Sequence, residues 1–156
     1  MRKKDIAIAK RLFRQRGFHK LYWKDESQTI IGNSYQILYI DNSEVNPDEV
    51  KYFDENKTND TIIDIDFLAK YNFTETIKIN TKDINKKTDK PFNIPTKNGT
   101  IYLNGKYLFD LLDWCKTDEF YYDPQVKNFT KGGSYKPPIY AKGDGRKGIL
   151  LPVISE

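Results

Sequence analysis

The sequence predicts an α+β fold in which two helices pack on one side of an antiparallel β-sheet. Two amphipathic segments, 3–16 and 105–116, are separated by short alternating segments rich in aromatic and β-branched residues. The resulting order is helix, strands, and then strand, helix, strands. Two half-units of similar plan, about 1–80 and 81–156, suggest an internal duplication within a single domain, 1–156.

The first helical segment has one apolar arc and one basic arc when its residues are placed at about 100° each. Its apolar arc, which we expect to face the core, consists of Ile6, Ile8, Ala9, Leu12 and Phe13. Its basic arc consists of Lys3, Lys4, Lys10, Arg11 and Arg14. Residues 1–24 hold nine Lys or Arg and one acid, whereas the whole chain has a net charge of only +4. This concentration predicts phosphate contacts with an anionic partner, although a solvated helix face that aids solubility is the alternative.

Strands are predicted on both sides of an acidic, loop-like segment, 41–60. The predicted strands are 18–24, 28–33 and 34–41, which form an antiparallel meander, followed by 61–68 and 75–80. A long polar connection, 81–99, is expected to hold a short paired segment around Phe92. A further strand, 100–104, ends at Asn104, which can cap the second helix.

The second helical segment has a broad apolar arc and a neutral polar one. Its apolar residues are Tyr107, Leu108, Leu111, Leu112, Trp114 and Cys115, and its outward residues are Lys106, Asp110, Asp113 and Lys116. After it, 119–123 is predicted as a strand. Segments 136–142 and 147–154 are expected to pair across Gly143-Asp144-Gly145, because Asp-Gly is a strong hairpin signal.

The cysteine count and the distribution of apolar residues indicate the cellular compartment. The single cysteine excludes an internal disulfide and fits a reducing compartment. The charged N-terminus lacks the apolar core of a signal peptide, and no stretch is long enough to span a membrane. We therefore expect a cytoplasmic protein without a membrane partner.

No catalytic, metal or cofactor site is predicted. His19 is the single histidine and is interpreted as a surface residue rather than a catalytic base. Asp60, Asp64 and Asp66 suit the outer face of a strand; their use by a small metal-dependent nuclease stays an alternative. The Gly-rich run 143–148 lacks the order of a phosphate-binding loop and is interpreted as a hairpin turn.

A second basic patch is predicted near the end of the chain. Its candidate residues are Lys136, Lys142, Arg146 and Lys147. Asp144 is the one acid between positions 127 and 147, so this patch could also bind phosphates. The nearby Tyr121 and Tyr122, and Tyr22 and Trp23 in the first half, could stack on bases but are more often core residues.

The last third of the chain resembles the last domain of bacterial DNA polymerase sliding clamps, the β-subunit processivity factors. The segments that carry the resemblance are "LNGKYLFDLL" (103–112), "DEFYYD" (118–123), "KPPIYAK" (136–142) and "GILLPVI" (148–154). The matching residues are Asn104, Lys106, Tyr107, Asp110, Leu112, Leu151, Pro152 and Val153.

The resemblance implies a non-enzymatic DNA-clamp-like domain whose helices face duplex DNA. Its implied partners are the DNA backbone, DNA polymerase or other replication proteins, and further copies of the chain, because clamps carry three such domains and this chain has room for one. Peptide binding in that family implies a partner site at Leu151, Pro152 and Val153. A scaffold or inhibitor of the replication machinery with the same fold is the alternative. The Asn/Lys/Ile-rich composition suits a phage or mobile-element protein.

Overall fold

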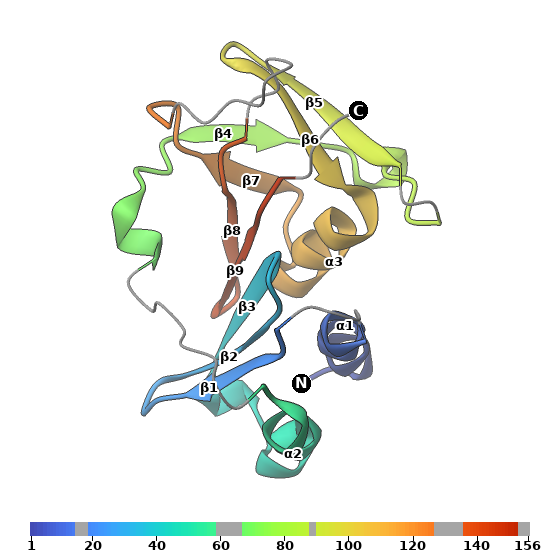
Figure 1. The fold of residues 1–156 in the computed structure, drawn as a ribbon, viewed down its shortest axis with the longest axis vertical. Helices are drawn as coiled ribbons and strands as arrows, with labels where there is room; N and C mark the ends of the chain where they lie inside the picture. Colours follow the sequence, from blue (N-terminus) through green and yellow to red (C-terminus); the bar gives the residue numbers. More distant parts are fainter. Residues whose placement is uncertain (15–18, 59–66, 88–89, 127–135, 153–156) are drawn as a thin grey trace.

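The computed structural model describes residues 1–14, 19–58, 67–87, 90–126 and 136–152. Figure 1 shows an α+β fold, which confirms the predicted class. The helices are α1 (Lys3–Phe13), α2 (Pro47–Asn56) and α3 (Gly105–Cys115), with 3-10 turns η1 (Asn42–Glu44), η2 (Phe67–Lys70) and η3 (Thr81–Asp83). The strands are β1 (Leu21–Lys24), β2 (Gln28–Gly32), β3 (Gln36–Asp41), β4 (Glu75–Lys78), β5 (Pro91–Thr96), β6 (Gly99–Asn104), β7 (Glu119–Tyr122), β8 (Ile139–Gly143) and β9 (Arg146–Leu150).

Seven strands form one antiparallel sheet in the order β1-β2-β3-β9-β8-β7-β4, and β5 and β6 form a separate ribbon. Strand β3, from the first third of the chain, pairs with the last strand, β9, at the centre of the sheet, where Leu38 lies opposite Gly148. On one side of this pair the sheet continues through β2 and β1, and on the other through β8 and β7. Each of these three-strand groups follows a helix in the chain, α1 or α3.

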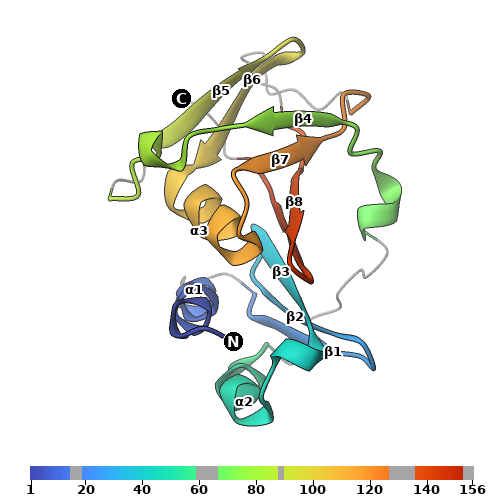
Figure 2. The same cartoon turned by 180° about the vertical axis from the view of Figure 1, so that it is seen from behind.

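The helices cover one face of the sheet (Figures 1 and 2). The α3 helix packs on β8 and β9, and α1 lies beside α3 over β2. Leu12 of α1, Leu108 and Leu111 of α3, and Leu38 and Leu150 of the sheet meet in the buried core. The indole of Trp114 also donates a hydrogen bond to the carbonyl oxygen of Tyr39, at 3.0 Å, which ties α3 to β3.

A third helix, α2, replaces the loop predicted within residues 41–60. Pro47 occupies its first turn, where a missing N–H group costs nothing. The N–H group of Asn46 donates to Oε1 of Glu49 at 2.8 Å, which satisfies a donor at the helix start. Phe53 of α2 is fully buried against Phe13 of α1, at a ring separation of 5.1 Å. The prediction of two helices was therefore wrong.

The other boundaries follow the sequence pattern closely. The α1 helix ends at Phe13, three residues before the predicted end, and residues 15–18 lie outside the described part. The predicted strand 61–68 falls largely on residues 59–66, which are also outside it, and its last two residues belong to η2. Most other predicted strands are confirmed, including the pairing around Phe92. The β8–β9 turn has positive φ angles at Asp144 and Gly145, as a type I′ hairpin requires.

No helix among the described residues is both long and apolar enough to cross a membrane.

Candidate nucleic-acid interface

The candidate interface is the groove between α1 and α3. This groove has a volume of about 400 Å³. The polar and charged residues that line it are Lys4, Arg11, Lys86, Lys106, Asp110 and Asp113. Two residues of the basic arc of α1, Lys4 and Arg11, thus face Asp110 and Asp113 of α3 across the groove.

Arg11 and Asp110 join the two helices by a paired contact. Nε of Arg11 lies 3.0 Å from Oδ2 of Asp110, and Nη2 lies 2.7 Å from Oδ1. Asp110 is buried, so the expectation that it faces water was wrong. Burial raises the pKa of Asp110, and the neighbouring guanidinium of Arg11 only partly opposes this. Arg11 therefore has a structural partner that the sequence pattern did not predict.

Lys4 is also paired across the helices. Its Nζ atom lies 2.9 Å from Oδ1 of Asp113, and Nη1 of Arg2 lies 3.7 Å from the same atom. The side chains of Lys4 and Asp113 remain accessible to solvent, so this ion pair adds little to stability. They nevertheless reduce the net positive charge that the groove presents.

The remaining cations of α1 have no carboxylate partner. Within the described ranges, Lys3 and Arg14 are exposed and form no ion pair. Nζ of Lys10 lies 4.9 Å from the ring centroid of Tyr52. Lys86, which was not among the predicted site residues, has its Nζ atom 4.1 Å from the ring centroid of Phe109 beside the groove. The high lysine content of the connection 81–99 is the sequence feature that could have indicated Lys86.

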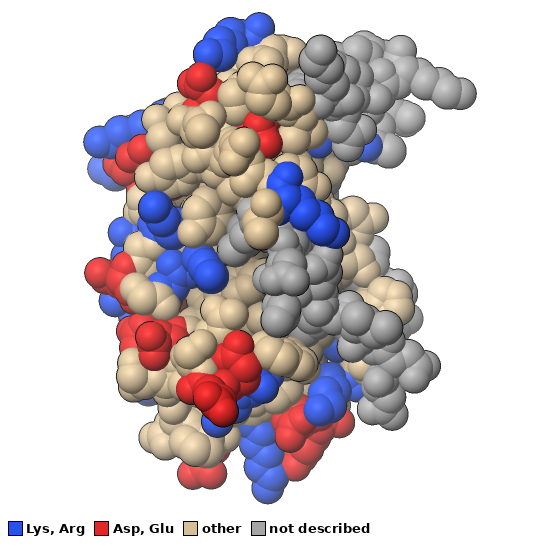
Figure 3. Space-filling view, turned by 90° about the vertical axis from the view of Figure 1, so that its left-hand side faces the viewer, with Lys and Arg blue, Asp and Glu red and all other residues tan. Residues whose placement is uncertain are grey.

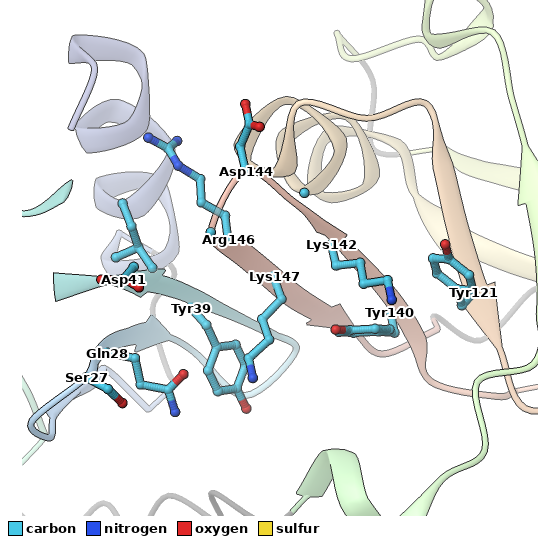
Figure 4. Close-up of a pocket in the computed structure, with 13 residues that line it drawn as sticks. Ser27, Gln28, Tyr39, Asp41, Tyr121, Tyr140, Lys142, Asp144, Arg146 and Lys147 are labelled. Carbon is cyan, nitrogen blue, oxygen red and sulfur yellow. The ribbon is translucent and has the colours of Figure 1, made fainter. Parts of the chain in front are cut away.

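The second predicted patch is divided by the sheet. Arg146 is buried on the helix side, where Nη1 lies 2.8 Å from Oδ2 of Asp5 and Nη2 lies 3.5 Å from Oε1 of Glu44. The inclusion of Arg146 in a surface patch was therefore wrong. Lys142 and Lys147 point to the opposite face, as strand alternation requires, and Figure 4 shows this difference in direction. Lys136 is partly exposed on the segment that precedes β8.

The helix-free face is mixed in charge. Figure 3 views the molecule from the side away from α1 and α3, and Asp and Glu gather mainly in the lower part of this view. Lys and Arg are scattered more widely over it. A pocket of about 560 Å³ lies on this side of the sheet, between β2, β3, β7, β8 and β9.

The predicted partner site is described only in part. Leu151 and Pro152 are partly exposed, and the N–H group of Leu151 donates to the carbonyl oxygen of Tyr35 at 2.8 Å. Val153 lies outside the described residues. This hydrogen bond holds the chain beside β3 for one residue beyond the end of β9.

The residues considered for catalysis or metal binding do not form a common site within the described part of the chain. His19 is exposed, and Cys115 is buried, which raises the pKa of its thiol to about 12. Asp60, Asp64 and Asp66 lie outside the described part of the chain. In the part that is described, no three His, Cys, Asp or Glu side chains gather as a metal site would need. Tyr122 belongs to the core, whereas Tyr121 reaches the sheet-face pocket.

No protein-family model matches the chain, and no curated protein matches it. Among solved structures, the chain is similar to a DnaN sliding clamp (DNA polymerase III subunit beta) from Bartonella birtlesii bound to griselimycin. The TM-score is 0.46 and the sequence identity is 9%. The alignment covers 98% of this chain and 64% of the clamp, so the chain spans less than two thirds of that protein. The activity and partners of the present protein do not follow from this similarity.

Proposed function

We propose that the protein is non-enzymatic and binds the phosphate backbone of duplex DNA through the α1–α3 face. The observation that carries this proposal is a set of exposed or partly exposed cations on α1 that no carboxylate of the described residues pairs with. Lys3, Lys10 and Arg14 have no carboxylate partner within the described residues, while the acids of α3 are already paired. A surface of this kind favours phosphates and leaves base sequence unread.

The clamp-like form of the proposal is supported by the arrangement of the sheet. Two groups, α1-β1-β2-β3 and α3-β7-β8-β9, meet at the β3–β9 pair with their last strands side by side. We interpret these groups as two duplicated halves. The resemblance of residues 103–154 to sliding clamps supports the same interpretation, and with it a role beside DNA polymerase or other replication proteins.

The proposal includes assembly of several copies. β4 is the last strand at one end of the sheet, and no strand among the described residues pairs with its outer edge. An unpaired edge favours pairing with another strand. The same edge favours the alternative function, a scaffold or inhibitor that docks on a replication protein by strand addition.

A charge reversal on α1 tests the DNA proposal. We expect the triple variant Lys3→Glu, Lys10→Glu, Arg14→Glu to lose measurable affinity for duplex DNA, because three phosphate contacts become repulsive. Lys4 and Arg11 are left unchanged, since their removal would leave Asp113 and Asp110 without partners. The measurement is fluorescence anisotropy of a labelled duplex over a series of salt concentrations. For the unaltered protein, log Kobs should fall with log salt by about 0.9 per phosphate contacted.

The matched control reverses three exposed lysines away from α1, Lys24, Lys78 and Lys97. It changes the net charge by the same amount and should keep most of the affinity. Equal losses in both variants would mean that net charge, and not the helix face, governs binding. Absence of salt-sensitive DNA binding in the unaltered protein would refute the proposal and favour the scaffold.

The nuclease alternative stays a prediction, because Asp64 and Asp66 lie outside the described residues. Cleavage of DNA that requires Mg²⁺ and is lost in Asp64→Asn would support it. The cytoplasmic location and the phage or mobile-element origin are also untested predictions.

A further inference from the structure

Two lysines lie directly opposite each other on the sheet face away from the helices. Lys142 of β8 and Lys147 of β9 are partners in the antiparallel register. Their side chains leave the sheet on the same side, so their Cβ atoms are about 5 Å apart. Like charges in this position repel each other and destabilise the pair unless an anion lies near them.

Two acids, Asp41 and Asp144, also line this pocket, and each has a partner of its own. Oδ2 of Asp144 lies 3.4 Å from Nζ of Lys116, and Oδ1 of Asp41 accepts a hydrogen bond of 2.9 Å from the N–H group of Ser43. In the described part of the chain, neither Lys142 nor Lys147 forms an ion pair. Within the described residues, the two ammonium groups are therefore not neutralised by a direct ion pair.

The lysines instead diverge toward tyrosine rings on the flanking strands. Nζ of Lys147 lies 5.2 Å from the ring centroid of Tyr39 on β3, and Nζ of Lys142 lies 5.6 Å from that of Tyr121 on β7. Both distances are within the range of a cation–π contact. Figure 4 shows the two side chains leaning apart, with the ring of Tyr140 beside the end of Lys142 and its hydroxyl on the side of Lys147. This divergence leaves a space between the two ammonium groups.

Hydrogen-bond donors line the same space. Tyr121 and Tyr140 are partly exposed, and among the described residues neither hydroxyl has a hydrogen-bond partner. Gln28 lies at the opposite rim of the pocket. The volume of about 560 Å³ is larger than a bare ion needs and falls in the range of small-molecule sites.

We propose that this pocket binds the phosphate group of a phosphate ester, between Lys142 and Lys147, with Tyr140 as a further donor. Two cations and a neutral donor match the several acceptor oxygens and the double charge of a phosphate monoester. The remaining volume holds the organic part of the ester. This site is on the other side of the sheet from the α1–α3 face and is independent of the DNA proposal.

The test is isothermal titration calorimetry of the full chain with defined probes. The probes are inorganic phosphate, adenosine monophosphate, and a short single-stranded oligothymidine with either a 5′-phosphate or a 5′-hydroxyl. We expect Lys142→Gln with Lys147→Gln to weaken binding of the phosphate monoester probes at least tenfold. Lys142→Arg with Lys147→Arg should retain it, because both charges remain.

The matched control, Lys24→Gln with Lys78→Gln, removes the same charge from other strands and should bind as the unaltered protein does. The α1 triple variant should also keep monophosphate binding. The oligomers identify the source of the phosphate: a tenfold preference for the 5′-phosphorylated strand indicates a strand end, and tighter binding of adenosine monophosphate indicates a free metabolite. Failure of every phosphate probe to bind, or equal binding by the Lys142→Gln, Lys147→Gln variant, overturns the proposal.

Discussion

Asp5 and Asp110 are both buried, but the burial of the arginine that each one pairs with differs. We expect this difference to decide how much each carboxylate contributes to stability. Asp5 pairs with Arg146, whose side chain is 3% exposed, whereas Asp110 pairs with Arg11, whose side chain is 45% exposed. Loss of Asp5 leaves a buried guanidinium with a more distant partner, Glu44, at 3.5 Å. Loss of Asp110 leaves Arg11 free to turn into water.

We therefore expect Asp5→Asn to lower the free energy of unfolding by about 3 kcal/mol at pH 7. The matched variant Asp110→Asn should change it by less than about 1 kcal/mol. Urea unfolding followed by circular dichroism measures both. A similar cost for the two variants would show that partner burial does not decide their contributions.

The Asp5 contribution also depends on pH. Burial acts to raise the pKa of Asp5, but hydrogen bonds from Arg2 and Arg146 outweigh it and hold the pKa below its ordinary value. Because folding lowers this pKa, the stabilisation is complete above the unfolded value of about 3.9 and is lost as the pH falls through the folded value. The difference in stability between the unaltered protein and Asp5→Asn should thus shrink in acid. A difference that stays constant down to pH 2 would contradict this explanation.

These pairs also mark the limit of what the sequence predicts at the residue scale. The basic arc of α1 and the apolar arc of α3 follow from helical periodicity. The partners of Arg11 and Arg146 do not, because they come from elements far away in the chain. Asp110 was assigned to water and Arg146 to a surface patch, since periodicity orders residues within one element and carries no information about a neighbour.

At the scale of elements, the backbone at the end of α3 packs directly against the backbone of β8. A Cβ atom at Gly143 would overlap the carbonyl oxygen of Cys115, which is backbone and cannot rotate away. Glycine is therefore required here by packing, beside the turn at Asp144 and Gly145.

We expect Gly143→Ala to lower the free energy of unfolding by about 2 kcal/mol, because α3 must move off the sheet to admit one methyl group. The neighbouring Lys142→Ala, at an exposed position, should stay within about 0.5 kcal/mol of the unaltered protein. Thermal unfolding by calorimetry compares the two. Equal melting temperatures for Gly143→Ala and the unaltered protein would mean that the helix and strand can separate without cost.

Elements with strong local signals were predictable, and α2 was not. The β8–β9 hairpin was recognised from Asp-Gly, and the start of α3 from Asn104, whose side chain accepts a hydrogen bond from the N–H group of Tyr107 at 3.2 Å. The acidic segment around Pro47 resembled a loop because it has few apolar residues. Burial of Phe53 by α1 stabilises that helix, which is a tertiary effect.

At the scale of the whole molecule, the outer edge of β4 tests the proposed assembly. The N–H group of Ile79 donates toward the β7 side, to the carbonyl oxygen of Asp118 at 2.9 Å. Since N–H directions alternate along a strand, those of Thr76 and Lys78 point outward.

Thr76→Pro removes an outward donor and leaves the ladder to β7 intact. We expect it to reduce the assembly to single chains, whereas Thr76→Ala, which keeps the N–H group, should assemble as before. Mass photometry reads the result directly. An unaltered protein with the mass of one chain, or a Thr76→Pro variant with an unchanged mass, would refute assembly through this edge.

The central pairing of β3 with β9 has a consequence for how the chain folds. These strands are roughly a hundred residues apart in sequence, so their contact closes a very long loop and belongs to the slow, non-local class of folding events. Before β9 arrives, β3 and β8 each present an open edge where the finished sheet has its middle. The protein is thus most prone to aggregate while it is being made, and the insertion of β9 ends that exposure.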